Sequence, residues 1–300
     1  MILSQKLTKG ATTLNSQVMP IKKLSLNDFH AVKQMNTGID DDYVIRIFDR
    51  LISSRTQELF GLFHEGELVS IGGYSLFGNN QYAMIGRLRS NLKLRSKGYS
   101  TALLTQLIKE LRQKPDVKWI GANTHVSNDP TRRVLEKIGM QPGLVSHYLT
   151  LTAPEKLNGY TPGAVWKEVF NTREKLSYLL NLSDNALGLF PYECYYPLPY
   201  DQVFFTENYL EEACMYVNPD KTRFVLIKND QKKYRYAHVK YFWNDHYQQP
   251  GFFETILDHW NKNDDNYGSW IDFSVEGFKQ IADVSPYEVQ DPWILYDVWT

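Results

Sequence analysis

The chain is poor in cysteine and has no long hydrophobic run, and each shortage excludes a class of protein. Its 300 residues include only Cys194 and Cys214, too few for a disulfide scaffold or a four-cysteine zinc site. The longest charge-free stretch, residues 68–86, contains the turn sequence Gly-Asn-Asn-Gln at 78–81, which favours two strands over a membrane span. Residues 1–9 lack an apolar core of secretory-signal length. We therefore predict a reducing, cytoplasmic setting and no membrane partner.

Charge is balanced over the whole chain but not along it. The net charge is -1, yet residues 1–150 hold 20 Lys and Arg against 12 Asp and Glu, and residues 151–300 hold 13 against 22. The second half also has 15 of the 20 Tyr and six of the seven Trp. This asymmetry predicts two domains with different ligands, although two halves that dock on each other would show it too. A pI near 6.7 and no continuous basic stripe argue against a nucleic-acid partner.

Hydrophobic periodicity predicts a mixed α/β first half. A stripe of leucine and isoleucine side chains makes the helix over 99–112 the clearest element. Strands are expected over 18–24, 59–63, 68–77, 81–89, 117–122 and 144–151, and the other helices over 26–34, after 40–42 and over 129–139.

The second half repeats this order after an irregular segment that is rich in proline and glycine. A shift of 151 residues places Trp119-Ile120 on Trp270-Ile271, which indicates an internal duplication, with chance agreement as the alternative. The expected elements are a helix over 166–180, a loop over 182–202, a hairpin over 223–242 that turns at 229–230, a helix over 252–260, a strand over 269–275, a helix over 278–284 and a strand over 293–299.

The most informative segment, residues 92–104, lies between a predicted strand and a predicted helix. Gly98 lets the backbone turn tightly, so the free N–H groups of the helix start point outward. Together with the helix dipole and the side chains of Lys93, Arg95 and Lys97, these groups form an anion site that suits a pyrophosphate. A solvated basic turn would have the same composition.

Two motifs resemble the GNAT superfamily of acyl-coenzyme A-dependent N-acetyltransferases. The family signature Arg/Gln-x-x-Gly-x-Gly/Ala is matched by Arg95-Ser96-Lys97-Gly98-Tyr99-Ser100, with serine at the last place. The family motif Asn-x-x-Ala-x-x-Leu-Tyr-Glu-Lys-x-Gly-Phe is matched at Asn128, Glu136, Lys137 and Gly139. The resemblance covers residues 18 to about 150.

This resemblance implies an α+β fold whose mixed sheet is splayed, with the pantetheine of the cofactor between the fourth and fifth strands. It further implies acetyl-coenzyme A as co-substrate and no metal. The residues that we expect to bind the cofactor are Arg89, Ser90, Arg95, Ser96, Lys97, Gly98, Tyr99, Ser100 and Asn128.

The catalytic groups of the family are less well matched. The tyrosine that commonly protonates the leaving thiolate is Leu135, and the strand over 81–90 has no Asp or Glu where many relatives keep a base. An acceptor amine with a pKa of about 10 must still lose a proton, and the thioester oxygen needs backbone donors, expected near Arg89 and Ser90. His125 is the candidate base, acting directly or through a water, and a surface or capping histidine is the alternative. Further candidates are Tyr99, Tyr148 and the terminal carboxylate of Thr300.

The second half resembles a decayed copy of the same fold. Its strand-to-helix loop, residues 244–251, lacks the cationic pattern, and Asp245 would repel phosphate. We therefore expect coenzyme A in the first copy alone. The predicted organisation is two tandem GNAT copies, the second degenerate: a GNAT acetyltransferase domain over residues 1–152, a linker over 153–165 and a degenerate GNAT-like domain over 166–300.

The predicted function is acetyl transfer from acetyl-coenzyme A to a primary amine of a small molecule or peptide, by a monomer or homodimer. The alternative is a catalytically silent acyl-coenzyme A-binding or regulatory protein. The acidic, aromatic second half predicts that the loop over 190–196 lies over the cleft of the first copy and favours a cationic amine. Alternatively, these aromatic side chains form the core and the interface between the two copies.

Overall fold

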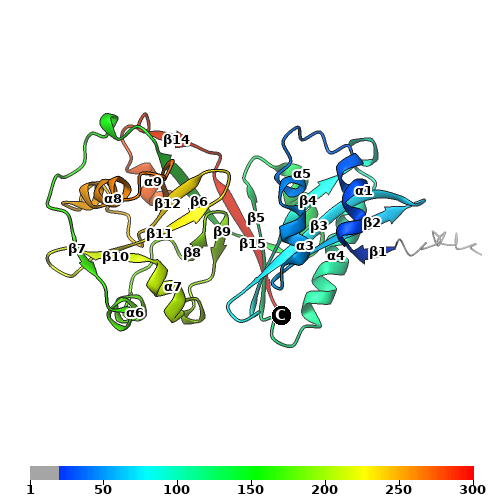
Figure 1. The fold of residues 1–300 in the computed structure, drawn as a ribbon, viewed down its shortest axis with the longest axis horizontal. Coiled ribbons are helices and arrows are strands. Elements are labelled where there is room, and N and C mark those ends of the chain that lie inside the picture. Colours follow the sequence, from blue (N-terminus) through cyan, green and yellow to red (C-terminus); the bar gives the residue numbers. More distant parts are fainter. Residues whose placement is uncertain (1–19) are drawn as a thin grey trace, which may run out of the picture.

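One mixed sheet runs through two lobes of the computed structural model, which describes residues 20–300 (Figure 1). In the first lobe neighbouring strands are antiparallel, except that β4 and β5 are parallel. These strands are β1 (Ile21–Lys23), β2 (Gln57–His64), β3 (Glu67–Phe77), β4 (Tyr82–Ser90) and β5 (Trp119–His125). Positions 18 and 19 of the predicted first strand lie outside the described residues, as does the rest of the stretch before residue 20.

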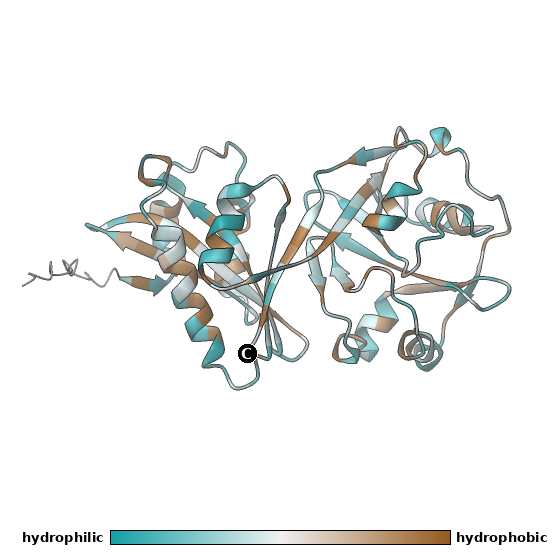
Figure 2. Cartoon of the chain, turned by 180° about the vertical axis from the view of Figure 1, so that it is seen from behind, coloured by the Kyte–Doolittle hydropathy of each residue, from teal (hydrophilic) through white to brown (hydrophobic). Residues whose placement is uncertain are grey.

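Helices cover both faces of this sheet because side chains alternate along each strand. Leu59 and Ile71 pack against the short helices α1 (Phe29–Gln34), α2 (Tyr43–Arg46) and α3 (Phe48–Ser53), and the 3-10 turn η1 (Leu26–Asp28) precedes α1. Phe60 and Tyr74 pack with the long helix α4 (Tyr99–Arg112) and with α5 (Asp129–Lys137) on the opposite face. The bounds predicted for α4 are confirmed, and Figure 2 shows hydrophobic residues along the strands of both lobes.

The second lobe has the same topology. Its strands β12 (Arg235–Lys240) and β13 (Gly268–Ser274) are parallel, and their other neighbours are antiparallel, as for β4 and β5. The remaining elements are η3 (Pro154–Lys156), β7 (Lys167–Val169), α6 (Thr172–Leu180), β8 (Phe190–Glu193), β9 (Tyr196–Leu198), η4 (Gln202–Phe204), α7 (Glu207–Glu212), β10 (Cys214–Val217), β11 (Phe224–Gln231), α8 (Phe252–Asn261), α9 (Val275–Lys279) and β14 (Tyr287–Val289).

The two halves of the chain exchange strands. The last strand, β15 (Trp293–Trp299), leaves the second lobe and pairs along its whole length with β5 of the first (Figure 1). Strand β6 (Gln141–Leu151) pairs with β15 near its start and with β13 over its second half. Ile294 and Tyr296 of β15 are buried in the core of the first lobe. Each lobe therefore contains a strand supplied by the other half of the sequence.

Several predicted elements of the second half are wrong. The helix expected over 166–180 begins only at Thr172, because Asn171 caps it and the preceding residues form β7. The hairpin does not turn at 229–230, because Asp230 continues β11 in register with Tyr236. The loop expected over 182–202 contains the β8–β9 hairpin. The helix expected over 278–284 is α9, which begins earlier, at Val275, and α7 and β10 were not predicted.

The duplication is clearer in space than in the sequence. The equivalent helices begin at Tyr99 and Phe252, and the equivalent strands at Trp119 and Gly268, so no single offset aligns the copies. The predicted shift of 151 residues lies midway between the sequence distance that separates the two helix starts and the one that separates the two strand starts. Among the helices of residues 20–300, none combines the length and apolarity needed to cross a bilayer.

Candidate active site

The sheet of the first lobe splits between β4 and β5. Their parallel pairing runs from Tyr82 and Trp119 to Ile85 and Ala122 and then ends, although both strands continue. Beyond Ile85, the backbone groups of β4 that face β5 have lost their strand partner, and such groups are available to a ligand. The splayed sheet that the family resemblance implied is thus present.

A β-bulge lies in β4 directly after the split. Gly73 of β3 is opposite Gly86, and Ile71 is opposite Arg89, so β4 has one extra residue between these pairs. Arg87 adopts a left-handed conformation there, with φ of 57°. A left-handed arginine costs free energy, and such strained positions cluster at functional sites. The bulge redirects the end of β4, where Arg89 and Ser90 lie.

The turn before α4 leaves its helix start uncovered. Ser96 and Gly98 are both left-handed, with φ of 66° and 83°. The first bond of the helix runs from the Ala102 amide to the Gly98 carbonyl, 2.9 Å apart, so the preceding amides have no helical acceptor. Within residues 20–300, no atom lies within 4 Å of where a Cβ on Gly98 would be. This open, exposed start is where the sequence predicted an anion site.

The basic side chains of this loop take different positions. Arg95 donates a hydrogen bond to the Thr37 carbonyl at 3.1 Å, which ties the loop to the segment between α1 and α2. Lys93 and Lys97 are exposed, and neither forms an ion pair with any residue from 20 to 300. Two of the three predicted cations are thus free to meet an anion at the helix start.

Serine hydroxyls connect the helix start to the end of β4. The Oγ atoms of Ser90 and Ser100 are 2.6 Å apart, and Ser70 donates to the Arg89 carbonyl at 2.9 Å. Ser100, which stands where the family signature has glycine or alanine, therefore fixes α4 against β4. Tyr99 points away from this network, since its ring is buried and packs 5.4 Å from that of His64.

The family motif that begins at Asn128 has a structural role in this chain. The Oδ1 atom of Asn128 accepts a hydrogen bond from the Thr131 amide at 3.3 Å and caps α5. Leu135 is buried in the core of the first lobe, so the family's thiolate-protonating tyrosine has no polar replacement at this place. The structure thus accounts for Asn128 as a helix cap.

His125 ends β5 beyond the split and is held in one orientation. Its Nδ1 lies 2.9 Å from the Asp291 carbonyl, which can only accept, so Nδ1 carries the proton and Nε2 of the neutral ring keeps a lone pair. The ring packs against Trp293 at 4.7 Å, and 38% of the side chain is exposed. This is the arrangement of an oriented proton acceptor.

The other candidate bases are less suited. Tyr148 is buried and stacks on Trp270 at 4.3 Å, and burial raises the pKa of its hydroxyl, so it stays protonated. Thr300 follows the end of β15 that pairs with Trp119, at the opposite end of the strand from His125. Its amide donates to the Lys118 carbonyl at 3.1 Å.

The equivalent helix start of the second lobe is covered. Gly251 precedes α8 in the same left-handed conformation, with φ of 80°, but a Cβ there would collide with the Ala164 carbonyl. Trp166 holds the covering segment in place, since its Nε1 donates to the Pro250 carbonyl at 2.7 Å and its amide to Thr255 Oγ1 at 2.9 Å. The charge of Asp245, expected to repel phosphate, is compensated by Arg223 at 3.0 Å.

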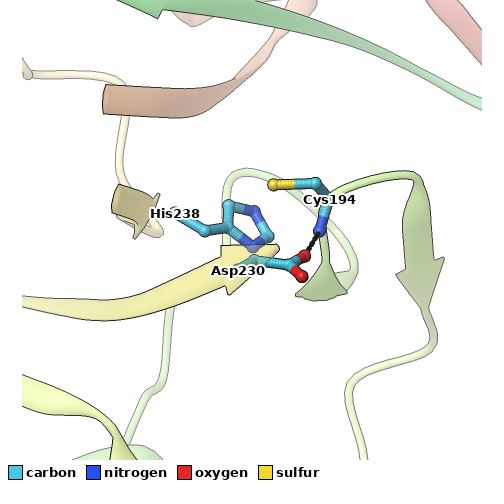
Figure 3. Close-up of side chains that lie close together, drawn as sticks. All are labelled: Cys194, Asp230 and His238. Carbon is cyan, nitrogen blue, oxygen red and sulfur yellow. Dashed lines mark hydrogen bonds between the residues drawn. The ribbon is translucent and has the colours of Figure 1, made fainter. Parts of the chain in front are cut away.

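Cys194, Asp230 and His238 lie close together in the second lobe, with one potential ligand atom of each within 4.8 Å of the others (Figure 3). The cluster is nevertheless a closed network. Asp230 accepts from the Cys194 amide at 2.8 Å, and the two ring nitrogens of His238 contact Asp272 at 2.7 Å and Lys240 at 3.1 Å. Both nitrogens of His238 are thus already occupied.

The fold defines a class of mixed α+β proteins whose sheet splits between two parallel strands. Residues 26–140, which form most of the first lobe, match the model of the acetyltransferase (GNAT) family. The resemblance that the two motifs indicated is thereby confirmed. A comparison with curated proteins gives no match.

Solved structures resemble the chain over nearly its whole length. A GCN5-related N-acetyltransferase from Sphaerobacter thermophilus has a TM-score of 0.60 at 11% identity, covering 94% of this chain and 95% of its own. A protein from Pyrococcus horikoshii assigned as an acetyltransferase has a TM-score of 0.57 at 12% identity, covering 97% and 93%. These likenesses confirm the predicted fold of two tandem copies, of which only the first matches the family model.

Proposed function

We propose that the protein is an N-acetyltransferase that moves an acetyl group from acetyl-coenzyme A to a primary amine of a small molecule or peptide. The observation that carries this proposal is the open start of α4 beside the split between β4 and β5. A helix start with free amides binds phosphate groups, and the split offers unpaired backbone groups next to it.

The residues present fit this cofactor. The amides of residues 97–100 would hold its pyrophosphate, because the missing Cβ of Gly98 leaves the space that a close approach needs. Lys93 and Lys97 add positive charge, and the backbone beyond Ile85 supplies donors for a thioester oxygen. When bound, acetyl-coenzyme A supplies the activated acyl group.

The chain's own groups must then remove one proton from the acceptor amine. An amine attacks only after it has lost its proton, and His125 Nε2 has the free lone pair to accept it, directly or through a water. The Asp291 carbonyl stabilises the imidazolium that results, because Nδ1 donates to it. In this proposal His125 assists, and no single side chain is indispensable.

A catalytically silent acyl-coenzyme A-binding or regulatory protein is the second candidate. Two observations favour it: Leu135 is buried where the family has a tyrosine, and β4 has no carboxylate. Both candidates bind the cofactor, so only turnover separates them.

A thiol-release assay with acetyl-coenzyme A and a panel of primary amines tests the proposal. Release that depends on the amine, with an acetylated product seen by mass spectrometry, supports acetyl transfer. Calorimetry with coenzyme A is run in parallel. Tight binding without amine-dependent release by any acceptor would establish the silent alternative, and the absence of binding would exclude both.

A further inference from the structure

Arg87 is a buried cation at the centre of the molecule. It lies on the β4 bulge, and only 9% of its surface is exposed. Its Nη2 donates to Gln57 Oε1 at 2.9 Å, to Ser75 Oγ at 2.9 Å and to Tyr196 Oη at 3.0 Å. None of the three acceptors is a carboxylate, and Tyr196 belongs to the second lobe.

The charge of Arg87 is uncompensated. Within residues 20–300, no carboxylate lies within ion-pair distance of its guanidinium, and its Nε is buried without any hydrogen-bond partner. Arg89, two residues further on, has its charge compensated by a carboxylate. Asp42 accepts from its Nε at 2.7 Å and from its Nη2 at 2.8 Å. Because burying an unpaired charge is costly, an anion from outside residues 20–300 would stabilise Arg87.

The face on which Arg87 lies is not the face of the cofactor loop. Its partner Ser75 alternates with Tyr74 along β3, and Tyr74 packs toward α4. Arg87 therefore points to the opposite face, where the second lobe meets the first. Its guanidinium lies just beyond the split and contacts Tyr196 of the second lobe.

Further buried polar atoms without a hydrogen-bond partner lie near the contact between the two lobes. Asn123 Oδ1, on β5 just past the split, and the indole nitrogens of Trp270 and Trp293 are buried without a partner in the described part of the chain. The half-exposed ring of Tyr195 packs against both tryptophans, at 5.0 Å and 5.8 Å. Tyr195 directly precedes Tyr196, the partner of Arg87. Aromatic walls with a few unpaired polar atoms are typical of small-molecule sites.

We infer that Arg87 binds an anionic group, a carboxylate or a phosphate, of the acceptor, so that the substrate is an amine that also carries a negative charge. This inference rests on the proposed function. A guanidinium donates to either anion through its N–H groups, and the Nε of Arg87 has no partner in the described part of the chain. The acceptor amine would then be oriented at the split, between the two lobes.

Matched acceptor pairs test this inference on the unaltered protein. L-Lysine is compared with cadaverine, which lacks the carboxylate, and O-phosphoethanolamine with ethanolamine, which lacks the phosphate. We expect kcat/KM, from thiol release, to be at least about 10-fold higher for the anionic member of one pair. The pair that shows the preference identifies which anion is recognised. Equal values within both pairs would overturn the inference.

Variants then assign the preference to Arg87. Arg87→Met should raise KM for the preferred anionic acceptor by about 10- to 100-fold, with kcat little changed and the uncharged control acceptor unaffected. Arg87→Lys should recover part of the loss, and Arg55→Met removes an exposed charge as control. A preference that survives in Arg87→Met, or weakened coenzyme A binding in that variant alone, would overturn the assignment.

Failure of the proposed function remains distinguishable. If no amine is acetylated, binding of Nε-acetyl-L-lysine and of N-acetylcadaverine is measured through tryptophan fluorescence with coenzyme A present. Binding of the carboxylate compound that disappears in Arg87→Met supports the anion site without catalysis. Equal binding or no binding of the two compounds argues against it.

Discussion

Gly98 and Gly251 precede equivalent helices with nearly the same backbone, φ of 83° and 80° and ψ of 3° in both. Gly98 faces open space, whereas the Ala164 carbonyl lies against Gly251. The local conformation of an anion-binding turn has therefore been kept in both copies, and the segment between the copies closes one of them. The difference in ligand binding that we expect arises from this cover, since Arg223 already compensates Asp245.

Gly98→Val is predicted to abolish coenzyme A binding. The side chain would fill the space over the helix start, and a β-branched residue is strained at this φ. Gly139→Val is the matched control, because Gly139 has φ of 87° and equally open surroundings but lies at the end of α5. Calorimetry should show binding by the control and none by Gly98→Val. Unchanged affinity in Gly98→Val would contradict the placement of the pyrophosphate.

One coenzyme A molecule is predicted to bind per chain. The covering segment of the second lobe is fixed by two hydrogen bonds from Trp166, so a pyrophosphate would have to displace them. Calorimetric stoichiometry measures this directly, and equilibrium dialysis with labelled coenzyme A checks it. Two molecules per chain would show that Ala164 and its neighbours move aside.

His125→Ala is predicted to slow turnover by less than about 100-fold, the loss expected for an essential general base. The reason is that β4 has no carboxylate to work with it, so water and backbone carbonyls take part of the proton transfer. The readout is kcat from thiol release across pH, with coenzyme A binding as a check. His30→Ala, which removes an exposed histidine, is the control. A larger loss at every pH would make His125 essential.

The parts of the candidate site that depend on local chemistry could be predicted from the sequence. The helix over 99–112, its glycine and the adjacent basic residues follow from periodicity and turn preference, which act over a few residues. The role of Ser100 is an exception, because its hydroxyl bonds Ser90, on a different element.

The parts that depend on long-range pairing could not be predicted. Nothing in the last strand indicates that it pairs with β5 rather than within its own half. The charge count of the second half could not show that Glu193 and Asp230 are both paired with Lys232, and the preference for a cationic amine stays a prediction. Arg87 did leave a signal, an arginine directly after the apolar residues 83–86 of its strand, but its lack of a partner is visible only in three dimensions.

The stability contribution of Lys240 is predicted to change with pH. Burial lowers the pKa of Lys240 to about 8, below the value of about 10.4 in an unfolded chain. Between these values the unfolded chain binds a proton that the folded chain does not, so the unfolding free energy rises with pH. Relative to Lys240→Met, the wild type should gain on the order of 1–3 kcal/mol between pH 8 and pH 10. Urea unfolding at both pH values measures it, and a constant difference between the two proteins would refute it.

The first copy is predicted not to fold when residues 153–300 are removed. The fragment 1–152 would lack β15, so one edge of β5 would lose its whole hydrogen-bonded partner, and the buried Ile294 and Tyr296 would leave a gap in the core. Filling a core and pairing an edge strand both stabilise a fold. Adding residues 290–300 to this fragment through a flexible linker should restore cooperative unfolding and coenzyme A binding. The same addition with Ile294 and Tyr296 changed to serine is the control. A fragment 1–152 that unfolds cooperatively and binds coenzyme A without β15 would show that the strand exchange is dispensable.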